Sequence, residues 1–328
     1  MANVLDVKSL NVEFNVNGTY FHAVRDASFY IRQGETLGLV GESGCGKSVT
    51  SLAIVRLLAK SGRISGQVMY DDKDLLTFPQ EAMREVRGNE ISMIFQEPMT
   101  SLNPVYKIGA QISEVVLLHK DVSRREALNQ SLEMLQKVGI PRPKEILEEY
   151  PHQLSGGMRQ RVMIAIAMAC NPRLLIADEP TTALDVTIQA QILELMREVS
   201  ETFGTSTLLI THDLGVVAEM CDRVAVMYAG QIVEEGSVEE IFFEPQHPYT
   251  RGLLNAIPKI DATAKQRLEP INGTVPSLTK MPTGCHFAPR CPFATQQCVA
   301  EAPSLFTVHD RHTSRCWLNE SEGVRTVE

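Results

Sequence analysis

The chain has 328 residues and a formal net charge of −9, with 44% hydrophobic and 22% charged residues, an ordinary composition for a globular protein. Without a long basic tract this charge argues against nucleic acid as a partner, because binding a phosphate backbone needs clustered Lys and Arg. We find neither an apolar stretch near the roughly 20 residues that span a bilayer nor a signal segment at the N-terminus. A cytoplasmic location is therefore expected, with any link to a membrane made through a partner.

Up to about residue 255 the sequence alternates short apolar runs with helical patterns, which predicts an α/β fold with a largely parallel sheet. Buried strands are expected at 36–40, 174–177 and 207–210. Apolar residues at helical spacing predict a helix from Ile188 to Phe203. A helical signal over 113–140 interrupts the strands and predicts an inserted helical subdomain.

Residues 41–48, GESGCGKS, match the P-loop pattern in full and lie between a predicted strand and a predicted helix. Its glycines let backbone N–H groups converge on a phosphate, and the helix N-terminus adds positive potential. Lys47 is expected to reach the β- and γ-phosphates of ATP, and the Ser48 hydroxyl to ligate Mg²⁺. The residues of this segment predicted to bind the nucleotide are Gly41, Glu42, Ser43, Gly44, Cys45, Gly46, Lys47, Ser48 and Val49.

The segment 174–179, LLIADE, is an apolar strand that ends in two carboxylates. A strand buried on both faces presents polar residues only at its carboxyl end, where ligands of such sheets bind. Asp178 suits the Mg²⁺ shell, and Glu179 suits a general base for the attacking water. A solvated acidic turn is the alternative, and the P-loop argues against it.

The segment 154–160, LSGGMRQ, places Ser155, Gly156 and Gly157 at the start of a predicted helix, which makes a second anion-binding helix terminus. One chain has one γ-phosphate to hold, so this terminus is expected to serve a nucleotide bound to another subunit. With the P-loop and the LLIADE strand in this order, the sequence resembles the ABC transporter ATPases. The resemblance implies a P-loop ATPase domain with a RecA-like core, an antiparallel β subdomain and a helical subdomain.

The resemblance implies roles for further residues. Gln96 is similar to the glutamine that senses Mg²⁺ and the attacking water, and His212 to the switch histidine at the γ-phosphate. Residues 182–185, TALD, resemble the loop that crosses to the partner subunit. An aromatic residue near the N-terminus is expected to stack on adenine, with Phe14 favoured and Tyr20 and Phe21 as alternatives.

Three segments resemble the peptide-importer branch of this family, in the "D" type of dipeptide systems: 96–104 (QEPMTSLNP), 247–254 (HPYTRGLL) and 284–292 with its GC and PRCP motifs. The implied function is ATP hydrolysis coupled to the uptake of dipeptides or oligopeptides. Nickel importers share much of this pattern and remain an alternative. The expected division is an ATPase domain at 1–258, with its helical subdomain at about 97–165, and a carboxyl-terminal extension at 259–328.

The family also implies partners: two integral-membrane permease subunits, a second and related ATPase (or a second copy of this chain), and, indirectly, an extracytoplasmic peptide-binding protein. The sequence argues against two rival functions. An ABC ATPase that acts on DNA or ribosomes would carry long coiled-coil inserts or two cassettes, whereas about 105 residues separate the P-loop from LSGGM here. A module that binds ATP only as a structural ligand would not need the complete set of Gln96, Asp178, Glu179 and His212.

Four of the seven cysteines lie in the last 44 residues, with spacings C-x5-C-x6-C-x17-C. Thiolates are soft ligands suited to Zn²⁺ or an iron–sulfur cluster. The extension has few core residues and is therefore expected to need a stabilising cross-link such as a bound metal. The resemblance implies a [4Fe–4S] cluster, with zinc second and unligated thiols third. The predicted ligands are Cys285, Cys291, Cys298 and Cys316.

Overall fold

The computed structural model describes residues 2–59, 61–96, 101–182, 184–257 and 271–320. The chain forms two compact units. The first comprises residues 1–4, 31–36 and 77–210, and the second comprises 5–30, 37–76 and 211–328. Within the described residues, no helix combines the length and apolar character needed to cross a membrane.

The first unit contains three parallel strands with β7 (Leu174–Asp178) in the middle. β6 (Ile91–Ile94) pairs on one side of β7 and β8 (Ser206–Thr211) on the other. Every residue of β7 and β8 is buried, as expected for strands covered on both faces. The predicted α/β class and the strands at 174–177 and 207–210 are confirmed.

The helices of the first unit include the predicted helical insertion, which consists of two helices rather than one run over 113–140. α4 (Ile108–His119) ends before Lys120, and α5 (Arg124–Lys137) begins after Ser123. Ser123 and Glu126 form a capping box, in which each side chain accepts a hydrogen bond from the other residue's backbone N–H, and this reciprocal bonding starts a new helix. The remaining helices are α2 (Gln80–Val86), α6 (Pro143–Ile146), α7 (Gly156–Met168) and α8 (Val186–Phe203).

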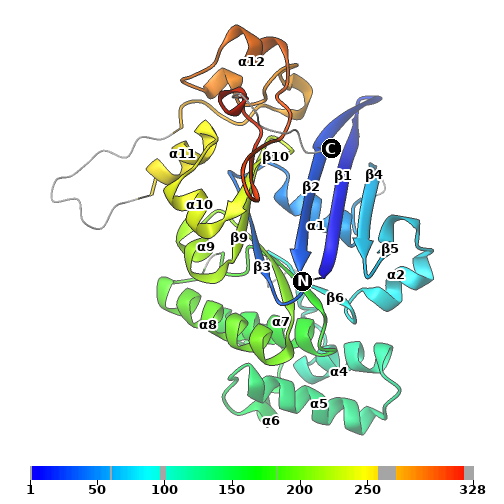
Figure 1. The fold of residues 1–328 in the computed structure, drawn as a ribbon. Helices are drawn as coiled ribbons and strands as arrows, with labels where there is room; N and C mark the ends of the chain where they lie inside the picture. The colour runs from blue at the N-terminus through cyan, green and yellow to red at the C-terminus, as the bar shows by residue number, and fades with distance from the viewer. Residues whose placement is uncertain (1, 60, 97–100, 183, 258–270, 321–328) are drawn as a thin grey trace, which may run out of the picture. The chain divides into compact units, whose positions relative to one another are not determined.

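The second unit holds an antiparallel sheet with the strand order β2-β1-β4-β5 (Figure 1). β1 (Asn3–Val16) and β2 (Thr19–Arg32) are long, β4 (Gly62–Tyr70) pairs antiparallel with β1, and β5 (Lys73–Asp74) is a short edge. The antiparallel β subdomain implied by the sequence is therefore present.

The second unit also holds β3 (Thr36–Val40), which pairs parallel with β9 (Arg223–Tyr228). β9 and β10 (Gln231–Ser237) pair antiparallel and form a hairpin with its turn at Ala229–Gly230. β10 then pairs with β12 (His312–Ser314), and β12 with β11 (Phe306–His309). Residues 306–314 thus add a hairpin to β10.

The second unit has helices both in its P-loop segment and in the carboxyl-terminal extension. They are α1 (Lys47–Ile54), α9 (Leu214–Met220), α10 (Val238–Phe243), α11 (Pro248–Asn255) and α12 (Gln296–Ala300). Three aromatic rings join α11 and the extension to β9: Tyr228 lies 4.6 Å from Tyr249 and 5.2 Å from Phe287, centroid to centroid. All three are buried, so the extension shares a core with the strands beside the P-loop.

Candidate nucleotide and metal sites

The P-loop connects β3 to α1 and needs glycine for steric reasons. A Cβ at Gly41 would lie 2.1 Å from the Met227 carbonyl oxygen. Gly46, the N-cap of α1, has a φ of 108°, a left-handed conformation that L side chains rarely adopt. The backbone therefore folds tightly around the N-terminus of α1, as a phosphate cradle requires.

Lys47 lies inside this loop and is only 5% exposed. Its Nζ donates hydrogen bonds to the Gly41 carbonyl at 2.8 Å and the Glu42 carbonyl at 3.2 Å. Those carbonyls hold the ammonium group within the loop, where we predicted it to meet phosphate oxygens. Nearby, burial raises the pKa of the Cys45 thiol, so Cys45 stays protonated at neutral pH.

The side chain of Glu42 is held by residues for which the sequence indicated no such role. Both of its carboxylate oxygens accept hydrogen bonds from the Arg290 guanidinium, at 2.6 and 2.9 Å. The Glu42 backbone N–H donates to the Tyr249 hydroxyl at 2.8 Å. The carboxylate raises the pKa of Arg290 above its ordinary value, so the pair is ionic. Arg290 and Tyr249 fall in the PRCP and HPYTRGLL segments, but no local signal in the sequence links either one to the P-loop.

In the first unit, β7 ends at two carboxylates. Asp178 is 4% exposed, and Glu179 has a φ of 47°, a left-handed conformation that is uncommon for a non-glycine residue and costs about 1–3 kcal/mol. The Glu179 Oε2 accepts hydrogen bonds from Gln96 Nε2 at 3.0 Å and from Thr182 Oγ1 at 2.8 Å. The structure thus brings Gln96 and Glu179 together, with a carboxylate fixed in orientation. Thr182 was part of a predicted loop, but its bond to Glu179 was not anticipated.

The N-terminus of α7 carries the Ser-Gly-Gly segment. Ser155 is exposed and caps the helix, accepting a hydrogen bond from the Met158 N–H at 3.3 Å. A Cβ at Gly157 would lie 2.9 Å from Ile188 Cγ2 on α8, so glycine permits this packing. The segment is not enclosed in its own unit, which is what a role toward another subunit requires.

The remaining predicted residues are placed as follows. His212 is exposed directly before α9, whose N-terminus is capped by Asp213. Phe14 lies on β1 opposite Gly62 of β4, and the Tyr20 ring is covered by the Arg63 guanidinium at 3.6 Å. Residues 97–100 and Ala183, parts of two predicted loops, lie outside the described residues. The P-loop belongs to the second unit, and Gln96, Asp178 and Glu179 belong to the first.

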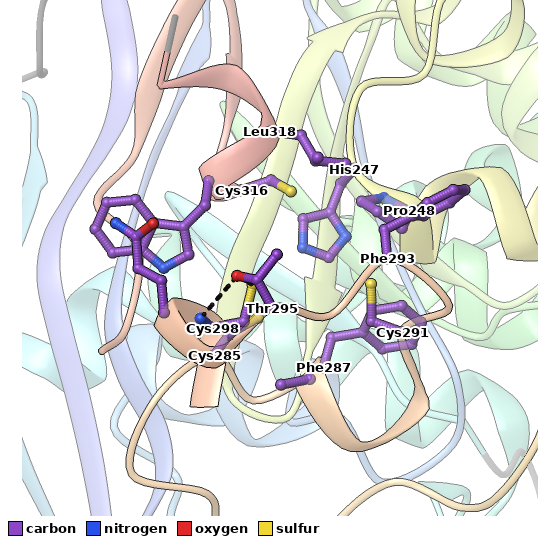
Figure 2. Close-up of a pocket in the computed structure, with 13 residues that line it drawn as sticks. His247, Pro248, Cys285, Phe287, Cys291, Phe293, Thr295, Cys298, Cys316 and Leu318 are labelled. Atoms are coloured by element: carbon purple, nitrogen blue, oxygen red, sulfur yellow. Dashed lines mark hydrogen bonds between the residues drawn. The ribbon is translucent and has the colours of Figure 1, made fainter. Parts of the chain in front are cut away.

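The four cysteines of the extension line one cavity of about 120 Å³ in the second unit (Figure 2). Its wall is mostly apolar and aromatic, with His247, Phe287 and Phe293 among its residues. Burial raises the pKa of the Cys285 and Cys291 thiols, and that of Cys316 to about 11. Burial also lowers the pKa of His247 to about 4, so its ring is neutral at pH 7.

The spacing of these thiols bears on what the cavity can hold. Within the described residues, no three of the four sulfurs lie within 4.8 Å of one another. A single Zn²⁺ with Zn–S bonds of about 2.3 Å needs sulfurs about 3.8 Å apart. A cluster in which each iron takes one thiolate needs a wider spacing. Four thiols that line one mostly apolar cavity have the donor chemistry for either a zinc ion or an iron–sulfur cluster.

The P-loop, the capped α7 and the carboxylates after β7 define a class of protein, the ATP-binding cassettes. Comparison with known sequences agrees: the family described as "ABC transporter" matches residues 24–182. A structure of the dimeric cassette MJ0796 bound to ADP and Pi is similar, with a TM-score of 0.64 and 25% identity over 71% of this chain and 98% of that chain.

The chain belongs to the ABC transporter family, as the sequence predicted. Residues 233–298 match the family described as "Oligopeptide/dipeptide transporter, C-terminal region". The chain is 55% identical to the oligopeptide transport ATP-binding protein AppD of Bacillus subtilis, over 99% of both chains. It is 51% identical to the dipeptide transport ATP-binding protein DppD of the same organism, over 100% of this chain and 98% of that protein.

Proposed function

We propose that this chain is the ATP-hydrolysing subunit of an ABC importer that takes up dipeptides or oligopeptides. The Glu179 carboxylate carries the catalytic part, because Gln96 and Thr182 fix its orientation at the end of β7. The peptide substrate is supported by the relatives, two of which are named for oligopeptide and dipeptide transport. The matched carboxyl-terminal family supports the same substrate class.

In this proposal the backbone N–H groups of 41–48 and the N-terminus of α1 hold the phosphates of ATP. Lys47 moves its ammonium from the loop carbonyls to the β- and γ-phosphates. Glu179 accepts a proton from the attacking water. The water oxygen forms a bond to the γ-phosphorus while the bond between that phosphorus and the β-phosphate oxygen breaks. His212 contacts the γ-phosphate, and the Phe14 ring stacks on adenine.

Ser48, Gln96 and Asp178 offer hydroxyl, amide and carboxylate oxygens, the donors that Mg²⁺ prefers. When bound, Mg²⁺ neutralises charge on the β- and γ-phosphates. The proposal keeps the predicted division into an ATPase domain at 1–258 and an extension at 259–328.

Two such cassettes are proposed to face each other head to tail. Ser155, Gly156 and Gly157 of one subunit then contact the γ-phosphate held by the P-loop of the other. The exposed Ser155 at the N-terminus of α7 supports this arrangement. ATP closes the pair and hydrolysis releases it, because only ATP provides the γ-phosphate that both subunits contact.

The partners follow from this cycle. The second cassette is proposed to be a related ATPase, with a second copy of this chain as the alternative. The transporter includes two integral-membrane permease subunits, and residues of the helical insertion bind a cytoplasmic loop of the membrane subunit, so the chain works at the cytoplasmic face of the membrane. An extracytoplasmic binding protein delivers the peptide.

Uptake by a strain that lacks this chain tests the substrate. We expect uptake of a radiolabelled dipeptide to fall to the transporter-free background and to return with the wild-type chain. A Lys47→Ala variant should not restore it, because the ammonium that contacts the phosphates is gone. Uptake of ⁶³Ni²⁺ in the same cells is the control. Loss of nickel uptake with unchanged dipeptide uptake would replace the peptide proposal by the nickel alternative.

The four-cysteine cavity is proposed to hold a [4Fe–4S] cluster through Cys285, Cys291, Cys298 and Cys316, with zinc as the alternative. The convergence of four cysteines on one mostly apolar cavity supports a soft-metal centre there. When bound, such a cluster supplies a redox-active, structurally stabilising link among four points of the extension. Burial raises the pKa of the Cys285, Cys291 and Cys316 thiols, so loading is expected to release protons.

Anaerobic purification tests the cluster. We expect about four irons and four sulfides per chain and a brown colour, and a Cys298→Ser variant should lose most of both. Cys170→Ser is the matched control, because Cys170 is buried and is not among the residues that line the cavity. A colourless protein that carries one zinc per chain would contradict the cluster and support the alternative.

A further inference from the structure

Two histidines and a glutamate meet beside the β11–β12 hairpin. His309 and His312 face each other across its turn, and Glu240 comes from α10. One ligand atom from each of the three lies within 4.8 Å of the others. These residues lie outside the P-loop, the β7 carboxylates and the four-cysteine cavity, so nothing described so far uses them.

His312 is the buried member of this group, with a side chain that is 0% exposed. Its Nε2 lies 2.8 Å from Glu234 Oε1. Glu234 is also fully buried and accepts hydrogen bonds from the backbone N–H groups of Gln246 and His247, at 2.6 and 2.9 Å. A carboxylate in that setting is an acceptor, so it places the proton of the neutral ring on Nε2.

In that tautomer of the ring, Nδ1 of His312 carries the lone pair. Among the described residues, this buried nitrogen has no hydrogen-bond partner, and leaving a buried polar atom unsatisfied is costly. A carboxylate that holds one ring nitrogen while the other faces a metal is a recurrent arrangement in metal sites. Glu234 and His312 have the chemistry of such a pair.

The two other members present donors as well. Glu240 Oε2 accepts hydrogen bonds from Ser237 N and Oγ, at 2.7 and 2.9 Å. The other oxygen, Oε1, lies 3.4 Å from Nδ1 of the exposed His309. Glu244 Oε2 lies 3.6 Å from Nε2 of the same ring, which adds a second carboxylate beside the group.

We propose that Glu240, His309 and His312 form a second metal site, which takes a borderline divalent transition metal such as Zn²⁺. Two imidazoles and one carboxylate suit Zn²⁺ and related ions, whereas Mg²⁺ and Ca²⁺ prefer oxygen donors alone. Glu234 orients His312 from behind. Bound metal cross-links the β11–β12 hairpin to α10 through these ligands and so stabilises the extension, independently of the four cysteines.

Zinc binding by the full chain tests this site. We expect the metal-depleted wild type to take up one more equivalent of Zn²⁺ than a His309→Ala variant, and to unfold at a higher temperature when zinc is present. Loss of an outer partner of a metal site already costs about 10–100-fold in affinity, so loss of His309 is expected to cost more than about 100-fold. With Co²⁺ as the probe, the extra equivalent should add no thiolate-to-metal charge-transfer band.

Two control variants distinguish a metal ligand at position 309 from a histidine that only forms a surface ion pair. His22→Ala removes an exposed histidine that also lies near a carboxylate, 3.3 Å from Glu13, and should bind zinc like the wild type. His309→Cys cannot form a cationic pair with Glu240 but can ligate zinc, so it should retain the extra equivalent. Equal zinc stoichiometry and equal zinc-induced stabilisation in wild type, His309→Ala and His22→Ala would overturn the proposal.

Discussion

A Glu179→Gln variant is expected to lose steady-state ATP hydrolysis by about 10²–10⁴-fold, the range that a general base contributes, while it still binds ATP. The amide keeps the shape of the side chain and its contacts with Gln96 and Thr182, but it accepts no proton from water. With hydrolysis blocked, ATP should hold two cassettes together. Phosphate release, binding of a fluorescent ATP analogue and size-exclusion chromatography with ATP measure the three effects.

A Glu198→Gln variant is the matched control, because Glu198 is exposed on α8 and loses the same charge. It should hydrolyse ATP within about twofold of the wild type, since surface substitutions away from a site have small effects. If Glu179→Gln turned over ATP at the wild-type rate, another group would have to accept the proton. If it failed to bind ATP, Glu179 would be supporting the fold of its unit instead.

The parts of the site that depend on local chemistry were predictable from the sequence. The run from Leu174 to Ala177 has no polar residue, and a strand with no polar face must be buried on both sides. Gly41 and Gly46 occupy positions where a side chain does not fit. At Gly41 a Cβ would meet a carbonyl oxygen, and at Gly46 the backbone has a positive φ. In both segments, neighbours in sequence supply the physical constraint.

One local signal was present and missed. The helical periodicity that predicted a single run over 113–140 came from Leu128, Leu132, Leu135 and Val138, which belong to α5 and its C-cap. The break before it is set by Ser123 and Glu126, whose spacing is that of a capping box. Attention to the cap would have predicted two helices in place of one.

The contacts between distant segments could not be predicted, because periodicity and spacing describe neighbours only. Glu42 and Arg290 are 248 residues apart, and Glu234 and His312 are 78 apart. Pairing of β10 with β12 brings the second pair together, and the shared core of Tyr228, Tyr249 and Phe287 brings the first. The four-cysteine cluster was predictable because its members are close in sequence, whereas the Glu240 site spans 73 positions (from 240 to 312).

The Arg290→Ala variant is expected to weaken ATP binding by about tenfold and to lower the free energy of unfolding by about 2–3 kcal/mol. Arg290 is 4% exposed and Glu42 is 30% exposed, so the loss should fall below the 3–5 kcal/mol of a fully buried pair. The guanidinium also donates to the Asn272 and Ile271 carbonyls. Without it, the Glu42 side chain loses the anchor that positions it, while the Glu42 backbone N–H keeps its bond to Tyr249.

Denaturant unfolding and binding of a fluorescent ATP analogue measure these two effects. Arg142→Ala is the matched control, because Arg142 pairs with Glu145 at 2.6 Å but both side chains are mostly exposed, and such pairs contribute about 0–1 kcal/mol. Arg290→Lys keeps the charge but not the paired donors, so its ATP affinity should lie between those of wild type and Arg290→Ala. If Arg290→Ala matched the Arg142→Ala control in both measurements, the extension would not be positioning the phosphate-binding loop.

If only the free energy of unfolding fell, Arg290 would support the fold without acting on ATP. A fall in ATP affinity that Arg290→Lys partly restores is the result expected of a positioning residue.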